Sequence, residues 1–384
     1  MEQKLYKKNS RGKIQQWTII TDGGTFYTIE GDVDGKLTTN VPTICEGKNI
    51  GKANETSPEE QAIREALSKV TKKREEGYAD TIEDAHVTKR EIEPMLAFGI
   101  EKCEKHLIGK KLASQPKLDG IRSVAPNSTT KVFTRNGKLV KVIPHIEDEL
   151  SKLFVDLQEL YPDVEAKIDG ELYNHLFKAD FNEIASIVKQ QKPVEEDFIK
   201  SKKYVQYHIY DIDIPNLTFK ERYKLLVQLI QDKGYQYLHL VETVFDLEID
   251  SPELDVLYFE EYIPDGYEGQ IIRVQDSFYE NKRTKNLVKR KEFMDDEFII
   301  RDVEEGLGTR SSMMGRLILL MKDGRIFESG CRGNFDYYRE LLLNKDHYIG
   351  KMATIRFQNY TPMKEDGEGG KPRFGVCIAI RDYE

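Results

Sequence analysis

One hexapeptide limits what this chain can fold into and do more than any other feature: Lys117-Leu118-Asp119-Gly120-Ile121-Arg122. It places an amine, a carboxylate, a glycine and a guanidinium within six residues. A lysine becomes a nucleophile only after losing its proton, and nearby cations favour that loss. An arginine beside it can bind a phosphate through a planar fork of donors, and the glycine indicates a turn at the end of a strand. The grouping suits a lysine that attacks a nucleotide phosphate, although a surface hairpin with a salt bridge would use the same residues.

Length, charge and cysteine use set the broad class. The 384 residues are enough for two or three domains, and the net charge of -9 means that a polyanion would have to bind at a local basic face. The four cysteines are far apart and form no C-x-x-C pair, which argues against a zinc site and against a disulfide framework. The N-terminus opens no apolar signal region, and no run approaches membrane-spanning length. We therefore expect a cytoplasmic protein with reduced thiols and no membrane partner.

Residues 1–86 indicate a small α+β domain. Strand-like runs at 15–20 and 25–30 flank an Asp-Gly-Gly turn. Ser57, Pro58 and Glu60 form the capping box of a helix. Its apolar stripe consists of Ala62, Ile63, Ala66, Leu67 and Val70. The layout resembles the WGR domain, a DNA-binding module, but the Trp-Gly-Arg signature is absent. The scattered basic residues, Arg11 among them, contact DNA under this hypothesis; a solvated surface or a protein-binding domain is the alternative.

The rest of the chain divides into two further segments. Residues 80–86 indicate a linker, and residues 87–293 mix strands and helices. Residues 294–384 contain five β-type runs, at 298–303, 316–321, 325–329, 352–357 and 376–381, with a helix at 335–344. Five strands with an interposed helix indicate an OB-fold, a small barrel often used on nucleic acids. The loop 306–314 is too short to form a large clasp around a duplex.

An ordered set of motifs follows the hexapeptide. A cation-bearing turn spans 133–138, and Asp169-Gly170-Glu171 indicates a turn that ends in a carboxylate. Residues 207–212 form an aromatic strand, and Glu268 heads a buried strand. Lys289 and Lys291 alternate, so they share one face of a strand. Each motif alone has an ordinary structural explanation, because acid-glycine turns, tyrosine-rich core strands and basic edge strands are common.

Taken in order, these motifs resemble motifs I, III, IIIa, IV and V of the covalent nucleotidyltransferases. The stretches 278–284, 287–291 and 372–381 are similar to ATP-dependent DNA ligases of the small viral, phage and bacterial type, and the resemblance covers about residues 90–384. The R-x-D-K ending of capping enzymes is missing. The resemblance implies an α+β multidomain protein. An ATP-grasp-like nucleotidyltransferase domain with antiparallel sheets, at 87–293, would lie between the accessory domain, at 1–86, and a C-terminal OB-fold β-barrel, at 294–384.

The resemblance also implies a three-step reaction. Lys117 would attack the α-phosphorus of ATP and carry AMP, AMP would pass to the 5′-phosphate of a nick, and the 3′-hydroxyl would displace it. The implied cosubstrate is ATP, the implied metal is Mg²⁺ or Mn²⁺, and the implied partner is nicked double-stranded DNA, bound by a monomer. A metal and cations would neutralise charge on the transferring group.

Site residues follow from the matching positions. The catalytic set implied is Lys117, Asp119, Lys289 and Lys291. The set implied to bind ATP and AMP is Gln115, Arg122, Arg135, Glu171, Tyr210, Arg283, Lys289, Lys291, Arg373 and Arg381. The metal ligands implied are Glu268, Asp169 and Glu171, and the DNA contacts are Arg122, Arg135, Arg316 and Arg332. Within these sets Tyr210 matches the aromatic that stacks on adenine, and Glu171 matches the residue that holds a ribose hydroxyl. Gln115 stands where related ligases often carry glutamate.

Other functions remain open from the sequence. An RNA ligase or a capping-type nucleotidyltransferase would use the same motifs, because sequence barely reveals contacts to a 2′-hydroxyl. A non-catalytic nucleic-acid-binding protein is the alternative from another class, and the presence of every matching catalytic side chain argues against it. An NAD-dependent ligase is disfavoured because zinc-binding cysteines are absent.

Overall fold

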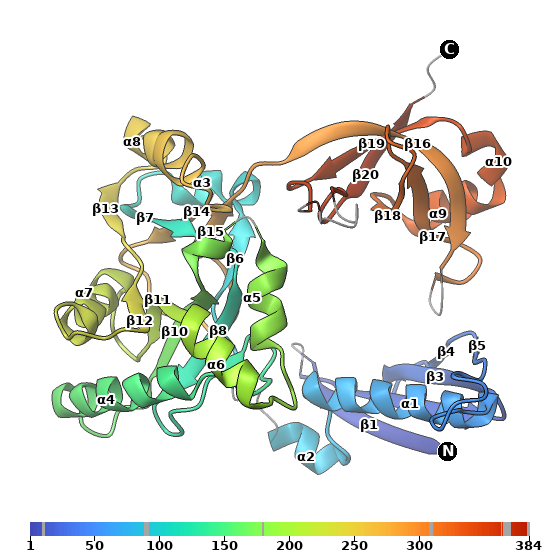
Figure 1. Ribbon diagram of the computed structural model, residues 1–384, viewed down its shortest axis with the longest axis horizontal. Helices are drawn as coiled ribbons and strands as arrows, with labels where there is room; N and C mark the ends of the chain where they lie inside the picture. The colour runs from blue at the N-terminus through green and yellow to red at the C-terminus, as the bar shows by residue number, and fades with distance from the viewer. Residues whose placement is uncertain are drawn as a thin grey trace. The chain divides into compact units, whose positions relative to one another are not determined.

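The computed structural model describes residues 1–9, 12–87, 92–178, 180–306, 310–361, 363 and 370–381. The chain divides into a central unit, Glu91–Glu292, and a second unit made of Met1–Arg90 and Phe293–Glu384 (Figure 1). Strands and helices are mixed along the chain, as expected for an α+β protein. No helix among the described residues has the length and apolar character needed to cross a membrane.

The N-terminal segment is one antiparallel sheet packed against a helix. Its strands are β1 (Glu2–Lys8), β2 (Ile14–Asp22), β3 (Thr25–Asp32), β4 (Thr38–Thr39) and β5 (Thr43–Ile44). Helix α1 (Pro58–Glu75) begins with the predicted capping box of Ser57 and Glu60. Alternate strand residues such as Trp17 and Phe26 pack against Ala62 and Ala66 of the helix.

Two expectations for this segment are wrong. Ile63 and Leu67 belong to the predicted apolar stripe of α1 but are 39% and 50% exposed, so the buried stripe is narrower. The expected linker at 80–86 includes part of helix α2 (Ile82–Val87), in which Ala85 is buried. Arg11 lies outside the described residues.

The central unit contains two five-stranded sheets. We call them the Lys117 sheet and the Glu171 sheet after a residue in each. In the Lys117 sheet the order is β13 (Val244–Leu247), β7 (Leu112–Lys117), β14 (Gly269–Val274), β15 (Arg283–Arg290) and β6 (Leu96–Gly99). In the Glu171 sheet it is β12 (Leu238–Leu240), β11 (Gln206–Asp213), β10 (Lys167–Tyr173), β8 (Ile121–Pro126) and β9 (Phe133–Thr134). The pairs β11–β12 and β15–β6 are parallel, so the expectation of antiparallel sheets holds for the other pairs only.

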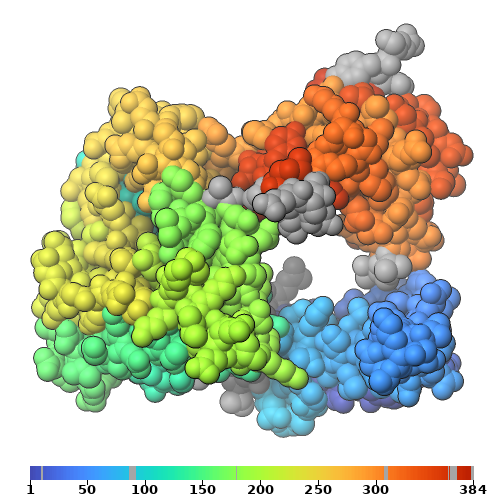
Figure 2. Space-filling model, viewed as in Figure 1, coloured from blue at the N-terminus to red at the C-terminus, as the bar shows by residue number. Residues whose placement is uncertain are grey.

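The helices of the central unit leave one face of the Glu171 sheet for the site. Its longer helices are α4 (Pro144–Leu160), α5 (Phe181–Val188), α6 (Glu195–Tyr204) and α7 (Phe219–Ile230). The shorter helical segments are η1 (Ile100–Lys102), α3 (Glu104–Leu107), η2 (His175–Phe177), α8 (Pro252–Val256) and η3 (Leu257–Tyr262). Apolar residues of α4, α5 and α7 form one core with Ile168, Leu172 and Ile209 of the sheet. Because side chains alternate along a strand, Asp169 and Glu171 point to the opposite face. In the space-filling view most of the visible face of the central unit has the green to yellow colours of the part of the chain that includes α4, α5, α6 and α7 (Figure 2).

The C-terminal segment is a closed five-stranded barrel. Its strands, in barrel order, are β16 (Met294–Glu305), β17 (Met314–Leu320), β18 (Ile326–Cys331), β20 (Val376–Arg381) and β19 (Met352–Phe357). Helices α9 (Phe335–Leu343) and α10 (Lys345–Tyr348) lie between β18 and β19 in the chain. The five predicted strands and the predicted helix are all present, and α10 was not predicted. Residues 307–309 of the loop expected at 306–314 lie outside the described residues.

Candidate active site

Lys117 lies where the chain passes from one sheet to the other. It is the last residue of β7 in the Lys117 sheet, and residues 118–120 lead directly into β8 of the Glu171 sheet. The segment is therefore a crossing between sheets, and the surface hairpin is ruled out. Gly120 is required for close approach: a Cβ there would lie 2.4 Å from the carbonyl oxygen of Leu172 and 2.8 Å from the Glu171 Cγ. The glycine therefore brings the lysine segment up against β10.

Glu268 holds two lysines at once. The Lys117 Nζ donates to one of its carboxylate oxygens and the Lys291 Nζ donates to the other. The Glu268 N–H also donates to the Lys117 carbonyl oxygen at 2.9 Å. The three side chains are 19%, 16% and 8% exposed for Lys117, Lys291 and Glu268, so the ion pairs are shielded from solvent. The arrangement fixes the Lys117 amine and sets a second cation close to it.

Further cations lie around this triad. Lys289 on β15 is paired with Ile271 on β14. Burial lowers the pKa of Lys289, and Lys117, Arg283 and Arg135 lower it further, which places four cationic side chains within electrostatic reach of one another. The Arg283 guanidinium donates to the Ala97 carbonyl oxygen and lies 5.6 Å from the Phe98 ring centroid. A concentration of cations in a partly buried site attracts a polyphosphate anion.

Arg122 is clamped by Asp169. Its Nε donates to one carboxylate oxygen at 3.0 Å and its Nη2 to the other at 2.6 Å. Arg135 lies beside it, because the Arg135 N–H donates to the Arg122 carbonyl oxygen at 3.0 Å. The turn that carries Arg135 is confirmed: the Gly137 φ is +81° and the Gly137 N–H donates to the Thr134 carbonyl oxygen. Arg122 on β8 and Arg135, directly after β9, are thus neighbours along the backbone, and guanidinium groups bind phosphate well.

Asp169, Gly170 and Glu171 do not form the predicted turn. They lie inside β10, where the register with β11 shifts between Asp169 and Gly170. A Cβ at Gly170 would lie 2.7 Å from both the His208 carbonyl oxygen and the Tyr207 ring, so the glycine accommodates that ring across the strands. Asp169 contacts Arg122 on β8, and Glu171 contacts Tyr210 on β11.

Glu171 and Tyr210 lie together on the face of their sheet opposite to the core formed with α4, α5 and α7. The Tyr210 hydroxyl donates to the Gly170 carbonyl oxygen at 3.2 Å and contacts a Glu171 carboxylate oxygen at 3.4 Å. The Tyr210 ring centroid is 5.8 Å from the Arg122 guanidinium and 5.6 Å from that of Arg273. Burial raises the pKa of Glu171 to about 7, against the opposing effect of Lys117 and Arg122.

The raised pKa of Glu171 predicts a pH-dependent stability. Between the unfolded value of 4.5 and about 7, the folded protein holds a proton that the unfolded chain releases, so stability falls as pH rises through this window. Above about pH 7 the ionised Glu171 lowers the free energy of unfolding by a constant amount, about 2–3 kcal/mol, because the side chain still reaches solvent in part. Glu171→Gln should therefore raise the melting temperature more at pH 8 than at pH 5. Glu196→Gln on exposed α6 is the control, and an equal effect of Glu171→Gln at both pH values would contradict the prediction.

Gln115 belongs to a buried polar network that sequence reasoning missed. Its amide nitrogen donates to the Tyr210 carbonyl oxygen at 3.1 Å and to the Thr243 hydroxyl at 2.9 Å. Its amide oxygen accepts from the Arg273 Nε at 2.8 Å. Arg273 in turn donates to Asp211 at 2.7 Å, and Asp211 accepts two hydrogen bonds from Arg222 at 2.7 and 3.1 Å.

Both new arginines carried a signal in the sequence. Arg222 interrupts an apolar helix face made of Phe219, Leu225, Leu226 and Leu229, and a charge at such a position needs a buried partner. Arg273 ends the motif that begins with Glu268. The Leu118 side chain packs with Tyr173 and Val241. The negative charge of Asp119, the next residue, helps to raise the pKa of Glu171.

Four predicted site residues belong to the barrel and not to the central unit. Arg316 donates to Glu304 at 2.6 Å and to Glu328 at 2.8 Å, so two carboxylates compete with any phosphate for it. The Arg381 Nε lies 3.3 Å from a Glu297 carboxylate oxygen and donates to the Thr354 hydroxyl. The Arg373 guanidinium lies 5.0 Å from the Phe374 ring centroid, and Arg332 follows the last residue of β18.

The carboxylates do not form an all-protein metal cage. No group of three or more histidine, cysteine or acidic side chains suited to a metal occurs among the described residues. Asp169 is engaged by Arg122, and the raised pKa of Glu171 makes it a weaker ligand. Mg²⁺ usually keeps several waters and takes one or two carboxylates with substrate phosphates. Glu268 lies next to the nucleophile and would fit such an ion by exchanging one of its two lysine contacts for the metal.

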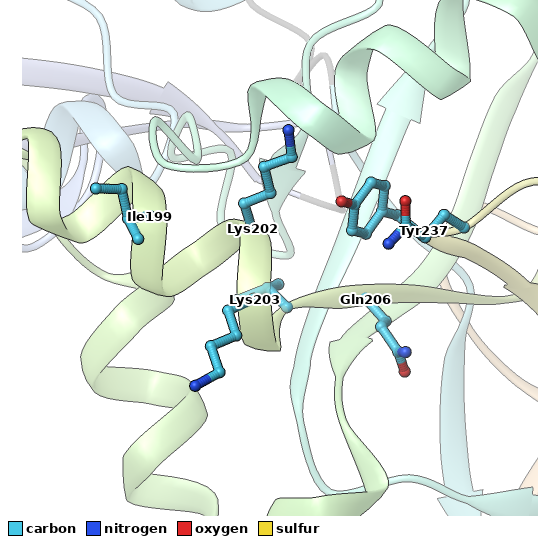
Figure 3. Close-up of a pocket in the computed structure, with 7 residues that line it drawn as sticks. Ile199, Lys202, Lys203, Gln206 and Tyr237 are labelled. Atoms are coloured by element: carbon cyan, nitrogen blue, oxygen red, sulfur yellow. The ribbon is translucent and has the colours of Figure 1, made fainter.

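A cavity of about 500 Å³ in the central unit is separate from these residues (Figure 3). Lys202 and Lys203 of α6 line it with Gln206, Gln236 and Tyr237. None of the predicted site residues lines it. The candidate site is therefore the cation-lined region around Lys117.

The chain is similar to known proteins in sequence and in fold. The family model "ATP dependent DNA ligase domain" matches residues 94–291. The DNA ligase of African swine fever virus (isolate Tick/South Africa/Pretoriuskop Pr4/1996) is 28% identical over 294 residues, a match that covers 73% of this chain and 64% of the viral protein. The chain thus spans slightly less than two thirds of that relative's length.

Two solved structures share the fold. Pmar-Lig_Pre. superposes with a TM-score of 0.64 at 22% identity and covers 83% of this chain and 72% of its own. A structure from work on Lig E DNA ligases and DNA binding with a minimal scaffold has a TM-score of 0.57 at 23% identity, covering 76% and 98%. At these identities the likeness concerns the fold.

Proposed function

The chain belongs to the ATP-dependent DNA ligase family, and from that premise we propose that it seals nicks in duplex DNA with ATP as cosubstrate. The observation that carries the proposal is the position of Lys117 between two sheets. Lys117 bonds Glu268, which also holds Lys291, and it lies within electrostatic reach of Lys289 and, like Arg122, of Glu171. A nucleophile, a cation cluster and a carboxylate that can take a metal meet there. That set is what transfer of a nucleotide to an amine requires.

In the first step Lys117 forms a bond to the α-phosphorus of ATP. Its nitrogen loses a proton, the bond from phosphorus to the pyrophosphate oxygen breaks, and pyrophosphate leaves. Lys289 and Lys291 stabilise negative charge on the phosphates, and Arg122 and Arg135 orient them. Asp119, which follows the nucleophile by two residues, adds a carboxylate to the same segment.

The nucleoside would lie on the face of the Glu171 sheet that carries Glu171 and Tyr210. Tyr210 offers a ring for stacking on adenine and Glu171 offers a carboxylate for the ribose. Arg283, with its guanidinium on the Ala97 carbonyl, would contact AMP from β15. Gln115 already uses both N–H groups within the protein, so we propose that it positions Tyr210 and that any contact with adenine uses its oxygen.

A metal ion, Mg²⁺ or Mn²⁺, would be held by Glu268 together with substrate phosphates. When bound, it would neutralise charge on the transferring phosphoryl group. Because Glu268 also pairs with Lys117, the same carboxylate connects metal binding to the nucleophile.

Two further steps need a nicked duplex. AMP moves from Lys117 to the 5′-phosphate, and the 3′-hydroxyl then attacks that phosphate and releases AMP. We propose that the barrel is an OB-fold that binds DNA through Arg332 and Arg316. Arg316 would have to exchange Glu304 or Glu328 for a phosphate. Arg373 and Arg381 would contact ATP during the first step.

The N-terminal segment is proposed to add affinity for the duplex. Removing residues 1–86 should raise the KM for nicked DNA about tenfold, as expected when one or two phosphate contacts are lost. Adenylylation of Lys117 should be unchanged. Lys72→Glu tests the same idea in the full-length protein, because Lys72 is exposed on α1. An unchanged KM in both variants would contradict the proposed role.

Labelled ATP tests the proposed function directly. Incubation with ATP labelled at the α-phosphate should leave label on the protein, and a chase with nicked duplex DNA should transfer it to DNA and then release AMP. Parallel reactions with labelled NAD and with nicked RNA separate the rival ligases. Absence of covalent label from ATP, or label that nicked DNA does not discharge, would overturn the proposal.

A further inference from the structure

A tyrosine outside the predicted site residues touches the carboxylate that holds Arg122. Tyr279 lies in the segment between β14 and β15, and its hydroxyl donates to an Asp169 carboxylate oxygen at 2.6 Å. The same oxygen accepts from the Arg122 Nη2 at 2.6 Å. Asp169 therefore receives three hydrogen bonds from two side chains, two from Arg122 and one from Tyr279.

A main-chain N–H group also holds the Tyr279 hydroxyl in place. The Met95 N–H donates to the Tyr279 oxygen at 3.0 Å, and Met95 is only 1% exposed. With that lone pair occupied, the remaining hydroxyl proton is directed at Asp169. Burial, and then the charge of Asp169, raise the pKa of Tyr279 well above its ordinary value, so the hydroxyl remains a donor.

The ring of Tyr279 touches the second charge network. The Arg222 guanidinium lies 5.6 Å from its centroid, and Arg222 is fully buried on Asp211. Arg222 also donates to the Ser277 carbonyl oxygen at 3.1 Å, two residues before Tyr279. The backbone that carries the tyrosine is thus anchored to a rigid buried ion pair, which fixes where the hydroxyl points.

We infer that Tyr279 is a positioning residue for the phosphate-binding arginine. It orients the Asp169 carboxylate, and Asp169 in turn sets the plane of the Arg122 guanidinium toward the substrate phosphate. An arginine fork binds phosphate well only in the correct plane, so a small rotation weakens both of its hydrogen bonds. The inference rests on the proposed function, because it assigns Arg122 to the transferring phosphate.

A double-mutant cycle tests this inference in the full-length protein. Tyr279→Phe keeps the ring and removes only the hydroxyl, and it should slow single-turnover adenylylation of Lys117 about tenfold. Arg122→Lys keeps the charge but loses the two-pronged bond to Asp169. Adding Tyr279→Phe to Arg122→Lys should cost less than about twofold, because the orientation that Tyr279 supplies has already been lost.

Tyr262→Phe is the matched control. Tyr262 is also buried in the central unit, and its hydroxyl lies 3.2 Å from the Ser114 hydroxyl, away from Asp169. It should leave the rate within about twofold while lowering the melting temperature about as much as Tyr279→Phe. A purely structural role would be revealed by the same rate loss of Tyr279→Phe in the wild-type and Arg122→Lys backgrounds. That result, or equal rates for the two tyrosine variants, would overturn the inference. Labelling of the wild-type protein reports separately on the proposed function.

Discussion

Lys117→Ala is expected to abolish covalent labelling by ATP and, with it, the sealing of ordinary nicks. The reason is chemical: Lys117 supplies the amine at the end of β7, where the chain passes between the sheets. Lys291 bonds the other oxygen of the Glu268 carboxylate, and Lys289 lies on a different strand, β15. Retention of label on denatured protein, followed by assignment of the labelled peptide, measures the loss.

The same variant should still join a nick that already carries AMP on its 5′-phosphate. In that substrate the nucleotide has left the protein, so the amine is no longer its carrier. Loss of the Lys117 charge beside Glu268 removes an interaction worth about 1.5–3 kcal/mol, which slows this step by about tenfold to hundredfold. Lys285→Ala removes an exposed cation from β15 and should label normally. Sealing of ordinary nicks at the wild-type rate by Lys117→Ala would exclude a lysyl-AMP intermediate.

The sequence predicted which residues gather around Lys117 better than it predicted how they get there. Motif order alone indicated that Glu268 and Lys291 would act with Lys117, and all three side chains meet. The Asp169-Gly170-Glu171 motif was predicted as a turn because acid-glycine pairs are frequent in turns. Gly170 instead lies inside a strand, where the absence of a side chain makes room for the Tyr207 ring of the neighbouring strand. This requirement comes from tertiary packing, so the local sequence pattern does not predict it.

Charge partners were the least predictable part of the site. Arg316 was expected to bind DNA, yet its partners Glu304 and Glu328 are set by the register of three barrel strands. Arg222 and Arg273 meet at Asp211 from segments far apart in the chain. Such pairs depend on the packing of whole elements, whereas the capping box of Ser57 and Glu60 depends on neighbouring residues and was predicted correctly. The roles of the individual site residues stay predictions until the labelling experiments are done.

Asp211→Asn is expected to destabilise the central unit by about 3–5 kcal/mol, because it leaves two buried guanidinium groups without a countercharge. Asp211, Arg222 and Arg273 are 0%, 0% and 4% exposed at their side chains. Burial by itself would raise the pKa of Asp211, but the two arginines hold it below its usual range. Arg222→Met should cost less, because Asp211 keeps Arg273 as its partner. The order of the two losses therefore distinguishes a charge network from simple loss of packing.

Hydrogen exchange of the β11 and β14 amides in a urea series measures this loss where it occurs. The single tryptophan, Trp17, is buried in the N-terminal segment, so its fluorescence follows that segment and should be unchanged. Asp336→Asn breaks an exposed pair with Arg339 and is expected to change little, since solvent screens such pairs. If the β11 and β14 amides were as well protected from exchange in Asp211→Asn as in Asp336→Asn, the buried charge network would contribute nothing to the stability of the central unit. Arg222 and Arg273 would then hold Tyr210, Gln115 and Tyr279 in place through packing and not through their charge pairs with Asp211.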